Sequence, residues 1–324
     1  MNNDANISLP EDMAAMILPD LCLAYITNNK APKALSTLRV IKDNHHKTIS
    51  LEMSRKIMSM FLKKGTLEDI RTSTRLLLTC GGLTDNDSLQ LFTNSFMKSI
   101  DFVKGAVSIE SLPTDNEDGN IIPEVAFIGR SNVGKSSLVN MITNRKKLAF
   151  VSNTPGKTRE YNYFLAKGNI GKDKQMHKFY LVDLPGVGYA EVVKTKKDDW
   201  IDLLKAYSTQ RQTLRGIFHL VDSRHGLLNA DEECLSLLSS LPPHVKYVVV
   251  MTKVDKLIME DNKRMSGVVQ KIRMETKRFN ADADVPIIFT SSETKWGGAS
   301  IWSAILDIVH DEHAFDFSSL WVPM

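Results

Sequence analysis

The sequence predicts two regions of different fold class: an all-α region of helical hairpins, then an α/β domain with a mostly parallel sheet flanked by helices. Three observations carry this prediction. Over about the first hundred residues, apolar side chains recur at steps of three and four, which is typical of amphipathic helices. Later, several near-continuous apolar runs have the composition of strands buried on both faces. The first of these runs leads into a glycine-rich loop that ends in a lysine and two serines.

The composition suits a soluble chain of about two domains. It has 324 residues, 43% of them hydrophobic, and its 41 lysines and arginines stand against 38 acidic residues. The resulting net charge of +3 indicates no partner by itself. The cysteines, Cys22, Cys80 and Cys234, are far apart, which excludes a disulfide framework and the spacing of metal ligands. We expect reduced thiols, as in a cytosol or an organelle matrix, and no membrane span.

The N-terminus shows no legible targeting signal. Asp4, Glu11, Asp12 and Asp20 come before the first basic residue, Lys30. A transit peptide is basic and poor in acids, and a secretory signal begins with a positive charge. The expected location is therefore the cytoplasm or the matrix of a mitochondrion or plastid, without a signal that decides between them.

Residues 1–104 are expected to form the all-α region. Its apolar stripes are Leu35, Leu38 and Ile41, then Met53, Ile57 and Phe61, then Leu89, Phe92, Phe96 and Ile100. A weak internal echo with a period of about 36 residues lies in the range of helical repeats. Residues 61–68 resemble a degenerate pentatricopeptide repeat, a class that binds single-stranded RNA. An ordinary helical bundle with coincidental spacing is the simpler alternative, and both stay open. Residues 105–122, rich in turn formers, are expected to be a linker.

The chemistry of the second region begins at a loop of the form G-x-x-x-x-G-K-[ST]. The apolar run 125–128 precedes it, and residues 137–142 follow it with helical spacing. The loop consists of Gly129, Arg130, Ser131, Asn132, Val133, Gly134, Lys135 and Ser136. Its glycines permit close approaches, so that successive backbone N–H groups wrap a β-phosphate at the positive end of a helix dipole. We expect Lys135 to reach the β- and γ-phosphates and the Ser136 hydroxyl to hold Mg²⁺.

Two later loops have the composition of a nucleotide switch. Residues 154–158 form a polar turn with two threonines, placed between the first helix and a strand predicted at 161–166. A switch needs a segment here that closes on Mg²⁺ and the γ-phosphate. Farther along, an apolar strand ends in Asp183, Leu184, Pro185 and Gly186. Asp183 is placed to hold Mg²⁺, directly or through water, and the Gly186 N–H is placed to sense the γ-phosphate.

Two further apolar runs, residues 216–222 and 246–251, predict parallel strands. The second ends in Thr252, Lys253, Val254 and Asp255, a [NT]-K-x-D pattern. The Asp255 carboxylate can accept from both N1–H and the exocyclic amine of guanine, a donor pair that adenine lacks, so the pattern selects GTP over ATP. The Lys253 stem can lie over the base plane. Another apolar strand ends in Thr290, Ser291 and Ser292, whose backbone N–H groups are expected to contact the guanine carbonyl.

The residues of four stretches closely resemble the motifs of the EngB (YihA) GTPases. These GTPases belong to the translation-factor-related class that includes Era and EngA. These stretches are residues 127–138, 153–158, 183–190 and 221–226. The resemblance implies a P-loop GTPase domain over residues 123–310 that binds GTP and GDP with Mg²⁺ and acts in assembly of the large ribosomal subunit. It leaves residues 1–104 and the tail, 311–324, outside. Bacterial members lack a helical arm of this size, which suggests a eukaryotic, organellar version.

The resemblance also assigns site residues by motif. GTP contacts are implied at Gly129–Ser136, at Gly156, Lys157 and Thr158 in a segment that runs to Glu160, at Asp183–Gly186, at Thr252–Asp255 and at Thr290–Ser292. Mg²⁺ is implied at Ser136 and Thr158, beside Asp183. Glu160 departs from the family, which usually has an uncharged residue there, and this puts its contact in doubt.

Hydrolysis is expected to be slow. Val187 follows the Asp-x-Pro-Gly stretch, where many GTPases place a glutamine that orients the attacking water. Activation would come from a ribosomal partner or from K⁺ held with the help of Asn132, as in related GTPases; the alternative is that Asn132 only shapes the loop. The candidate catalytic residues are Lys135, Asn132, Thr158 and Gly186.

Two hypotheses for the whole chain remain. In the first, the protein is a GTPase switch that docks on a precursor of the large ribosomal subunit, as a monomer with no membrane partner. In the second, the helical region is an RNA- or protein-binding module carried on a GTP-stabilised scaffold with little hydrolysis. A basic set after Gly188 could touch rRNA phosphates or could be a solvated helix: Lys194, Lys196, Lys197, Lys205, Arg211 and Arg215.

Overall fold

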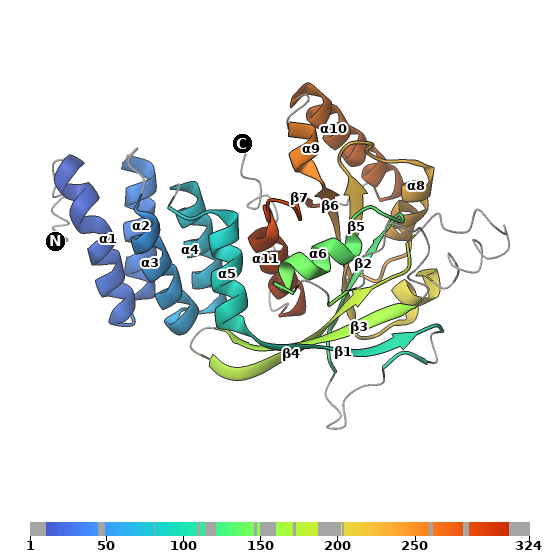
Figure 1. Ribbon diagram of the computed structural model, residues 1–324, viewed down its shortest axis with the longest axis horizontal. Coiled ribbons are helices and arrows are strands. Elements are labelled where there is room, and N and C mark those ends of the chain that lie inside the picture. Colours follow the sequence, from blue (N-terminus) through green and yellow to red (C-terminus); the bar gives the residue numbers. More distant parts are fainter. Residues whose placement is uncertain are drawn as a thin grey trace. The chain divides into compact units, whose positions relative to one another are not determined.

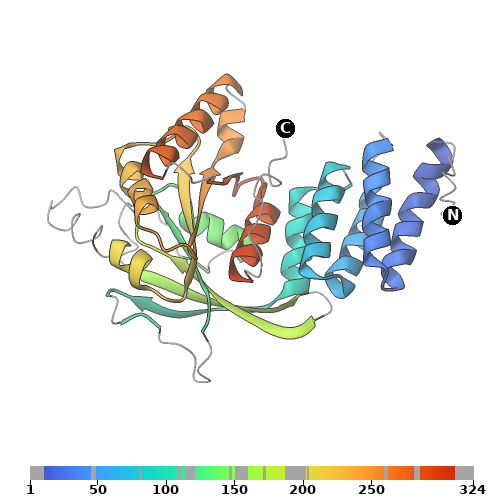
Figure 2. The same ribbon diagram turned by 180° about the vertical axis from the view of Figure 1, so that it is seen from behind.

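The computed structural model divides the chain into two compact units (Figures 1 and 2). One comprises Met1–Met97 with Asn169–His177, and the other comprises Lys98–Gly168 with Lys178–Met324. The described residues are 11–44, 49–80, 82–108, 111–113, 121–145, 148–149, 160–170, 173–186, 202, 204–258, 262–280 and 285–310. No helix within these ranges is long and apolar enough to cross a membrane. All three cysteines are free thiols, and burial raises the pKa of Cys22 to about 12.

The first unit is built from helices that pack as stacked hairpins (Figure 1). They are α1 (Glu11–Thr27), α2 (Ala31–Asn44), α3 (Leu51–Lys64), α4 (Leu67–Thr79) and α5 (Asp85–Phe96). Helix α1 packs on α2, and α3 packs on α4; the second hairpin then packs on the first through α1 against α3 and α2 against α4. The predicted region of helical hairpins is confirmed, and this stacking has the form of a helical repeat array.

Side chains define where these helices begin and how they are tied together. Thr66 and Asp69 form a reciprocal capping box at the start of α4, and Thr84 and Asp87 form another at the start of α5, which satisfies backbone N–H groups that lack helical partners. Asp87 also pairs with Arg55 of α3, so the cap of α5 is anchored to its neighbour.

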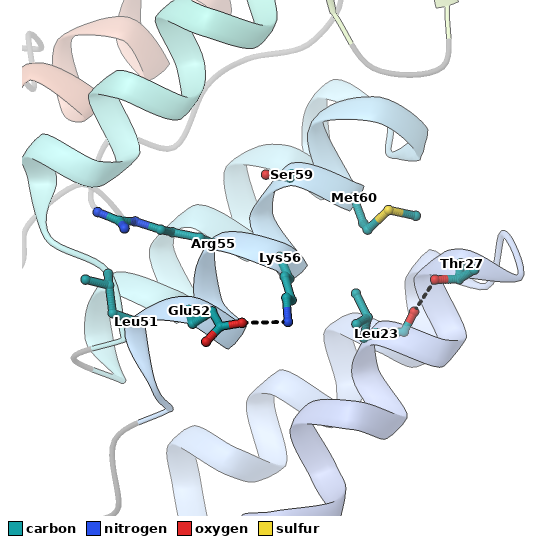
Figure 3. A pocket seen from close by; sticks show the side chains of 8 residues that line it. All are labelled: Leu23, Thr27, Leu51, Glu52, Arg55, Lys56, Ser59 and Met60. Carbon is teal, nitrogen blue, oxygen red and sulfur yellow. Dashed lines mark hydrogen bonds and ion pairs between the residues drawn. The ribbon is translucent and has the colours of Figure 1, made fainter.

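Helix α3 is also tied to α1, and a groove lies beside this contact (Figure 3). The Lys64 ammonium donates to the Thr27 carbonyl at 2.6 Å. The groove has a volume of about 740 Å³, and Glu52 and Lys56 form an ion pair of 2.8 Å along it. The lining residues are Leu23, Thr27, Leu51, Glu52, Arg55, Lys56, Ser59 and Met60. None of the nucleotide-binding motifs contributes to it.

The predicted end of the all-α region at residue 104 is wrong. Helix α5 ends at Phe96, and strand β1 occupies Met97–Ala106. The apolar stripe that begins at Leu89 includes Ile100, but Ile100 is buried as part of a strand and not of a helix. The nearby Phe102 and Val103 are of residue types that favour strands. The predicted linker is wrong at its start as well, since it includes the last strand residues, and Leu112 within it is buried.

The second unit contains a seven-stranded sheet in the order β1-β3-β4-β2-β5-β6-β7. The remaining strands are β2 (Glu124–Gly129), β3 (Tyr161–Ile170), β4 (Asp173–Asp183), β5 (Leu214–Asp222), β6 (Lys246–Thr252) and β7 (Ile287–Phe289). Strand β2 pairs in parallel with β4 and β5, β5 with β6, and β6 with β7. All residues of β2 are buried, as predicted for a strand covered on both faces.

Helices cover both faces of this sheet (Figures 1 and 2). They are α6 (Lys135–Ile142), α8 (Asn229–Ser236), η3 (Leu237–Ser239), α9 (Val254–Ile258), α10 (Asn262–Phe279) and α11 (Gly298–Val309). Helix α11 packs on α6, where the Trp302 indole donates to the Ile142 carbonyl at 2.6 Å, and α10 packs on α8. Because the central strands are parallel, the segments that follow β2, β4, β5, β6 and β7 all emerge at one edge of the sheet.

Candidate nucleotide-binding site

The loop after β2 has a backbone that its sequence makes possible. Gly129 has φ +141°, and a Cβ there would lie 2.6 Å from the Leu220 carbonyl oxygen of β5. Only glycine fits both the conformation and the space. Asn132 also has a positive φ, of 61°, and the left-handed Gly134 begins α6. The amides at the start of α6 therefore face the loop as an anion-binding helix terminus.

Lys135 lies at the first turn of α6 and is buried. Its ammonium donates to the carbonyls of Gly129 at 2.9 Å and Arg130 at 3.1 Å, so the side chain folds back across the loop. Burial lowers the pKa of Lys135, and the nearby Asp183 carboxylate opposes this shift. The Lys135 ammonium thus lies beside the loop backbone, and its predicted contact with the phosphates stays a prediction.

Ser136 and Asp183 form a pair of oxygen ligands suited to Mg²⁺. The Ser136 hydroxyl donates to Asp183 Oδ2 at 2.9 Å, and Asp183 is 1% exposed at the end of β4. Burial raises the pKa of Asp183, while Lys135 and the Ser136 hydrogen bond oppose the rise. Among the described residues, Oδ1 of Asp183 has no hydrogen-bond partner. A buried carboxylate oxygen without a partner is costly, and a hard divalent cation would satisfy it.

The Asp-x-Pro-Gly stretch touches the phosphate loop directly. A Cβ at Gly186 would lie 2.7 Å from Ser131 Oγ and 2.8 Å from Ser131 N. These distances are too short for any side chain, so only glycine allows the two backbones to approach this closely. A movement of the Gly186 backbone would therefore displace the Ser131 backbone. A γ-phosphate sensor needs this kind of coupling between the two loops.

The base-reading stretch is also tied to the phosphate loop. Thr252 Oγ1 donates to the Val133 carbonyl at 2.7 Å. The Lys253 ammonium donates to the Asn132 carbonyl at 2.7 Å and to Asp222 Oδ2 at 2.9 Å. Asp255 lies half-buried in the first turn of α9. The residues that would read the base and those that would hold the phosphates therefore form one connected site.

Of the backbone N–H groups predicted to contact the guanine carbonyl, those of Thr290, Ser291 and Ser292, two are already hydrogen-bonded within the protein. The Thr290 N–H donates to the Met251 carbonyl at 2.7 Å, and the Ser291 N–H donates to the Trp296 carbonyl at 3.0 Å. The prediction that both amides contact the guanine carbonyl does not fit these bonds. Ser292 is exposed, and its N–H makes no hydrogen bond within the described residues. The predicted contact with the guanine carbonyl is therefore left to the Ser292 N–H.

Asp222 is a site residue that motif reasoning missed. It lies at the end of β5, 3% exposed, and accepts hydrogen bonds from Arg224 and Lys253. Burial alone would raise the pKa of the Asp222 carboxyl, but these bonds outweigh burial and hold the pKa below its usual range. A usable signal existed, because Asp222 ends an apolar strand in the same way as Asp183.

Arg130 points its side chain away from the phosphate positions. Its Nε lies 2.9 Å from Asp231 Oδ2 in α8, and Asp231 is fully buried. Asp231 also accepts from the Leu228 N–H at 2.9 Å and lies 3.4 Å from His219 Nε2, while Tyr247 Oη is 2.9 Å from His219 Nδ1. Arg130 can therefore contact a nucleotide only through its backbone.

Two other predicted residues lie outside the site. Glu160 is placed against Gly105 of the edge strand β1, which β3 and β4 separate from β2. Arg211 was predicted to belong to a basic surface, but it donates to buried Glu124 at 2.9 Å and to the Pro113 carbonyl at 2.7 Å. The switch residues Gly156, Lys157 and Thr158, together with Val187, Lys194, Lys196, Lys197 and the tail, lie outside the described residues.

Comparisons with known proteins agree on one family. Residues 124–253 match the family model described as 50S ribosome-binding GTPase. The chain is 42% identical over 224 residues to a probable GTP-binding protein EngB of Roseobacter denitrificans, covering 69% of this chain and 94% of that protein. It is 40% identical to the EngB protein of Bartonella tribocorum (66% and 95%) and 45% identical to that of Cereibacter sphaeroides (62% and 84%).

The Gly186–Ser131 contact predicts the effect of a single methyl group. Replacing Gly186→Ala should weaken GTP binding about tenfold, because the added Cβ forces the two backbones apart at a cost of about 1–3 kcal/mol. GDP binding should suffer less, since the Gly186 N–H is expected to face the γ-phosphate, which GDP lacks. Titration with fluorescent GTP and GDP analogues measures both. The matched control is Gly267→Ala, where an added Cβ meets nothing within 4 Å; unchanged GTP affinity in the Gly186 variant would contradict the prediction.

The Arg130–Asp231 pair predicts a stability effect. Replacing Asp231→Asn removes the charge that the buried network surrounds and should cost about 3–5 kcal/mol in the free energy of unfolding. Urea denaturation of the variant measures this loss. Replacing Glu275→Gln, which breaks a pair in which Arg278 is 66% exposed, should cost less than about 1 kcal/mol. Equal stabilities for the two variants would show that the buried pair is not a structural anchor.

Proposed function

This chain belongs to the EngB family of GTPases, and from that premise we propose that it is a guanine-nucleotide switch that acts in assembly of the large ribosomal subunit. It would hydrolyse GTP slowly to GDP and phosphate. One observation supports the switch above all: three consecutive loop residues, Ser131, Asn132 and Val133, are each contacted by another nucleotide motif. The ribosomal part of the proposal is supported by the description of the matching family model.

The residues present fit a bound Mg²⁺ and the phosphates. Ser136 and Asp183 would hold the ion, which would neutralise charge on the phosphate oxygens, and Thr158 is proposed as a further ligand from the switch segment. Lys135 would add positive charge at the β- and γ-phosphates. The Gly186 N–H would report the γ-phosphate, and its close approach to Ser131 supports this role.

We further propose that K⁺ takes part in hydrolysis. Val187 lacks the polar group that would orient water, so charge stabilisation must come from elsewhere. The Asn132 backbone is fixed by its left-handed φ and by Lys253, which pins its carbonyl. Its side chain is exposed, and no hydrogen bond of its amide is present in the described part of the chain. The exposed amide is therefore available as a cation ligand, and the left-handed φ, which asparagine adopts more readily than most residues, shapes the loop as well.

The cation proposal predicts an ion-dependent rate. GTP turnover by the full chain should be at least about tenfold faster in KCl than in NaCl at equal ionic strength, because a positioned cation acts as an oxyanion stabiliser. Asn132→Ala should lose most of this difference while keeping GDP affinity within about threefold. Phosphate release measured in both salts is the assay. Identical wild-type rates in the two salts would exclude the cation role.

The second hypothesis keeps one observation in its favour. The helical unit has its own groove of about 740 Å³ between α1 and α3, independent of the nucleotide motifs. Such a groove could serve a binding module for which the GTPase domain is a stabilised carrier. The two functions differ in where binding to a ribosomal particle resides.

Removing the helical unit separates the two. The deletion should end at Phe96 rather than at residue 104, because Met97–Ala106 is a strand of the GTPase sheet. The proposed switch predicts that the shortened protein still co-sediments with large-subunit particles when GTP is bound and less so with GDP. Full-length protein is the control, and nucleotide affinity verifies folding. Loss of co-sedimentation with normal nucleotide binding would favour the helical-module function.

A further inference from the structure

Helix α10 has a larger net positive charge than any other described helix or strand of the chain. Its sequence, NKRMSGVVQKIRMETKRF, has six lysines and arginines against one glutamate. The net charge of this helix, +5, exceeds that of the whole chain, which is +3. The remainder of the protein is thus slightly acidic.

The charge lies on the outward side of the helix. Met265, Ile272 and Thr276 are buried and pack inward, while Lys271, Arg273, Lys277 and Arg278 are exposed. In Figures 1 and 2, α10 lies at the outside of its unit, beside α8. The 3.6-residue period therefore separates an apolar stripe from a basic one.

Lys271 and Arg278 on this face have only weak partners among the described residues. Lys271 Nζ reaches only the Leu227 carbonyl, at 3.4 Å. Glu275, the one acid of the helix, pairs with Arg278 at 3.3 Å, and Arg278 remains 66% exposed. Because four exposed basic residues stand against one glutamate here, the face keeps a net positive charge toward solvent.

Two uncharged residues on the same side point to a partner that approaches closely. Gly267 is exposed in the helix interior, and a Cβ there would meet nothing within 4 Å. Packing therefore does not require a glycine, although glycine weakens a helix relative to alanine. Met274, two turns along, is 72% exposed among the basic side chains. A bare backbone and an exposed thioether are useful where another molecule covers the helix.

We propose that the outward face of α10, defined by Lys271, Arg273, Lys277 and Arg278, binds the phosphate backbone of RNA. Closely spaced basic groups in excess over a single acid, Glu275, match the negative charge of a nucleic-acid strand, and affinity then comes from release of counterions. The inference rests on the proposed function, since it names the surface by which the switch would meet ribosomal RNA. It is a different surface from the basic set after Gly188, of which Arg211 bonds Glu124 and Arg215 bonds backbone carbonyls, while Lys194, Lys196 and Lys197 lie outside the described residues.

The test compares two doubly reversed full-length proteins of equal net charge. Lys271→Glu with Lys277→Glu alters the α10 face, and Lys104→Glu with Lys178→Glu alters exposed positions on β1 and β4. Binding to protein-free bacterial large-subunit rRNA is measured over a range of KCl concentrations, with nucleotide affinity and thermal melting as checks of folding. The α10 variant should bind at least about tenfold more weakly, with a log–log salt slope reduced by about 1 to 2, and the control should stay within about twofold of wild type.

The outcomes separate this inference from the proposed function. Equal rRNA binding by the two variants, or no rRNA binding by the wild type, overturns the α10 assignment. A second arm uses whole large-subunit particles. If the α10 variant loses particle binding but keeps rRNA binding, the partner of α10 is an acidic protein surface and the RNA assignment is wrong. If wild type binds rRNA through α10 but binds particles in neither nucleotide state, the inference stands and the proposed function fails.

Discussion

The Lys253 ammonium joins the two halves of the nucleotide site, and the rest of the site is arranged around that bond. It donates to the Asn132 carbonyl in the phosphate loop and to the Asp222 carboxylate at the end of β5. These contacts link residues 121 and 31 positions apart in the sequence. Since Asp222 is held by both Lys253 and Arg224, its charge is matched within the site. Reading the base and holding the phosphates are therefore not independent: displacement of Lys253 disturbs both.

The strand that carries the loop is fixed at its other end too. Glu124, at the start of β2, is fully buried and accepts from Tyr163, Tyr207, Arg211 and Thr213. Burial raises the pKa of Tyr163 and Tyr207, and the Glu124 charge adds to the effect, so both phenols stay neutral donors. A buried carboxylate with this many donors is satisfied rather than strained. Strand β2 is thus a rigid base, and a nucleotide-dependent change must arise in the segments that meet the loop from outside.

The sequence predicted the motifs well and their side-chain partners poorly, for a physical reason. The phosphate loop, the Ser136–Asp183 pair and the Thr252–Asp255 stretch follow local patterns at strand ends, and parallel strands bring those ends to one edge. The pairing of Arg130 with Asp231, and of Arg211 with Glu124 across 87 positions, depends on which helix packs where. Composition marks such residues as charged and nothing more. The amides of Thr290 and Ser291 were misjudged likewise, because their acceptors lie on other segments.

These internal pairs also decide where charge appears on the surface. The buried acids Glu124, Asp183, Asp222 and Asp231 each have a basic neighbour inside the GTPase unit. Their partners are Arg211, Lys135, Lys253 with Arg224, and Arg130. Arg130, Arg211, Arg224 and Lys253 therefore spend their charge on partners inside the unit rather than on its outer surface. Outward positive charge has to come from elements that the nucleotide chemistry does not use, and α10 is the element in which such residues are concentrated.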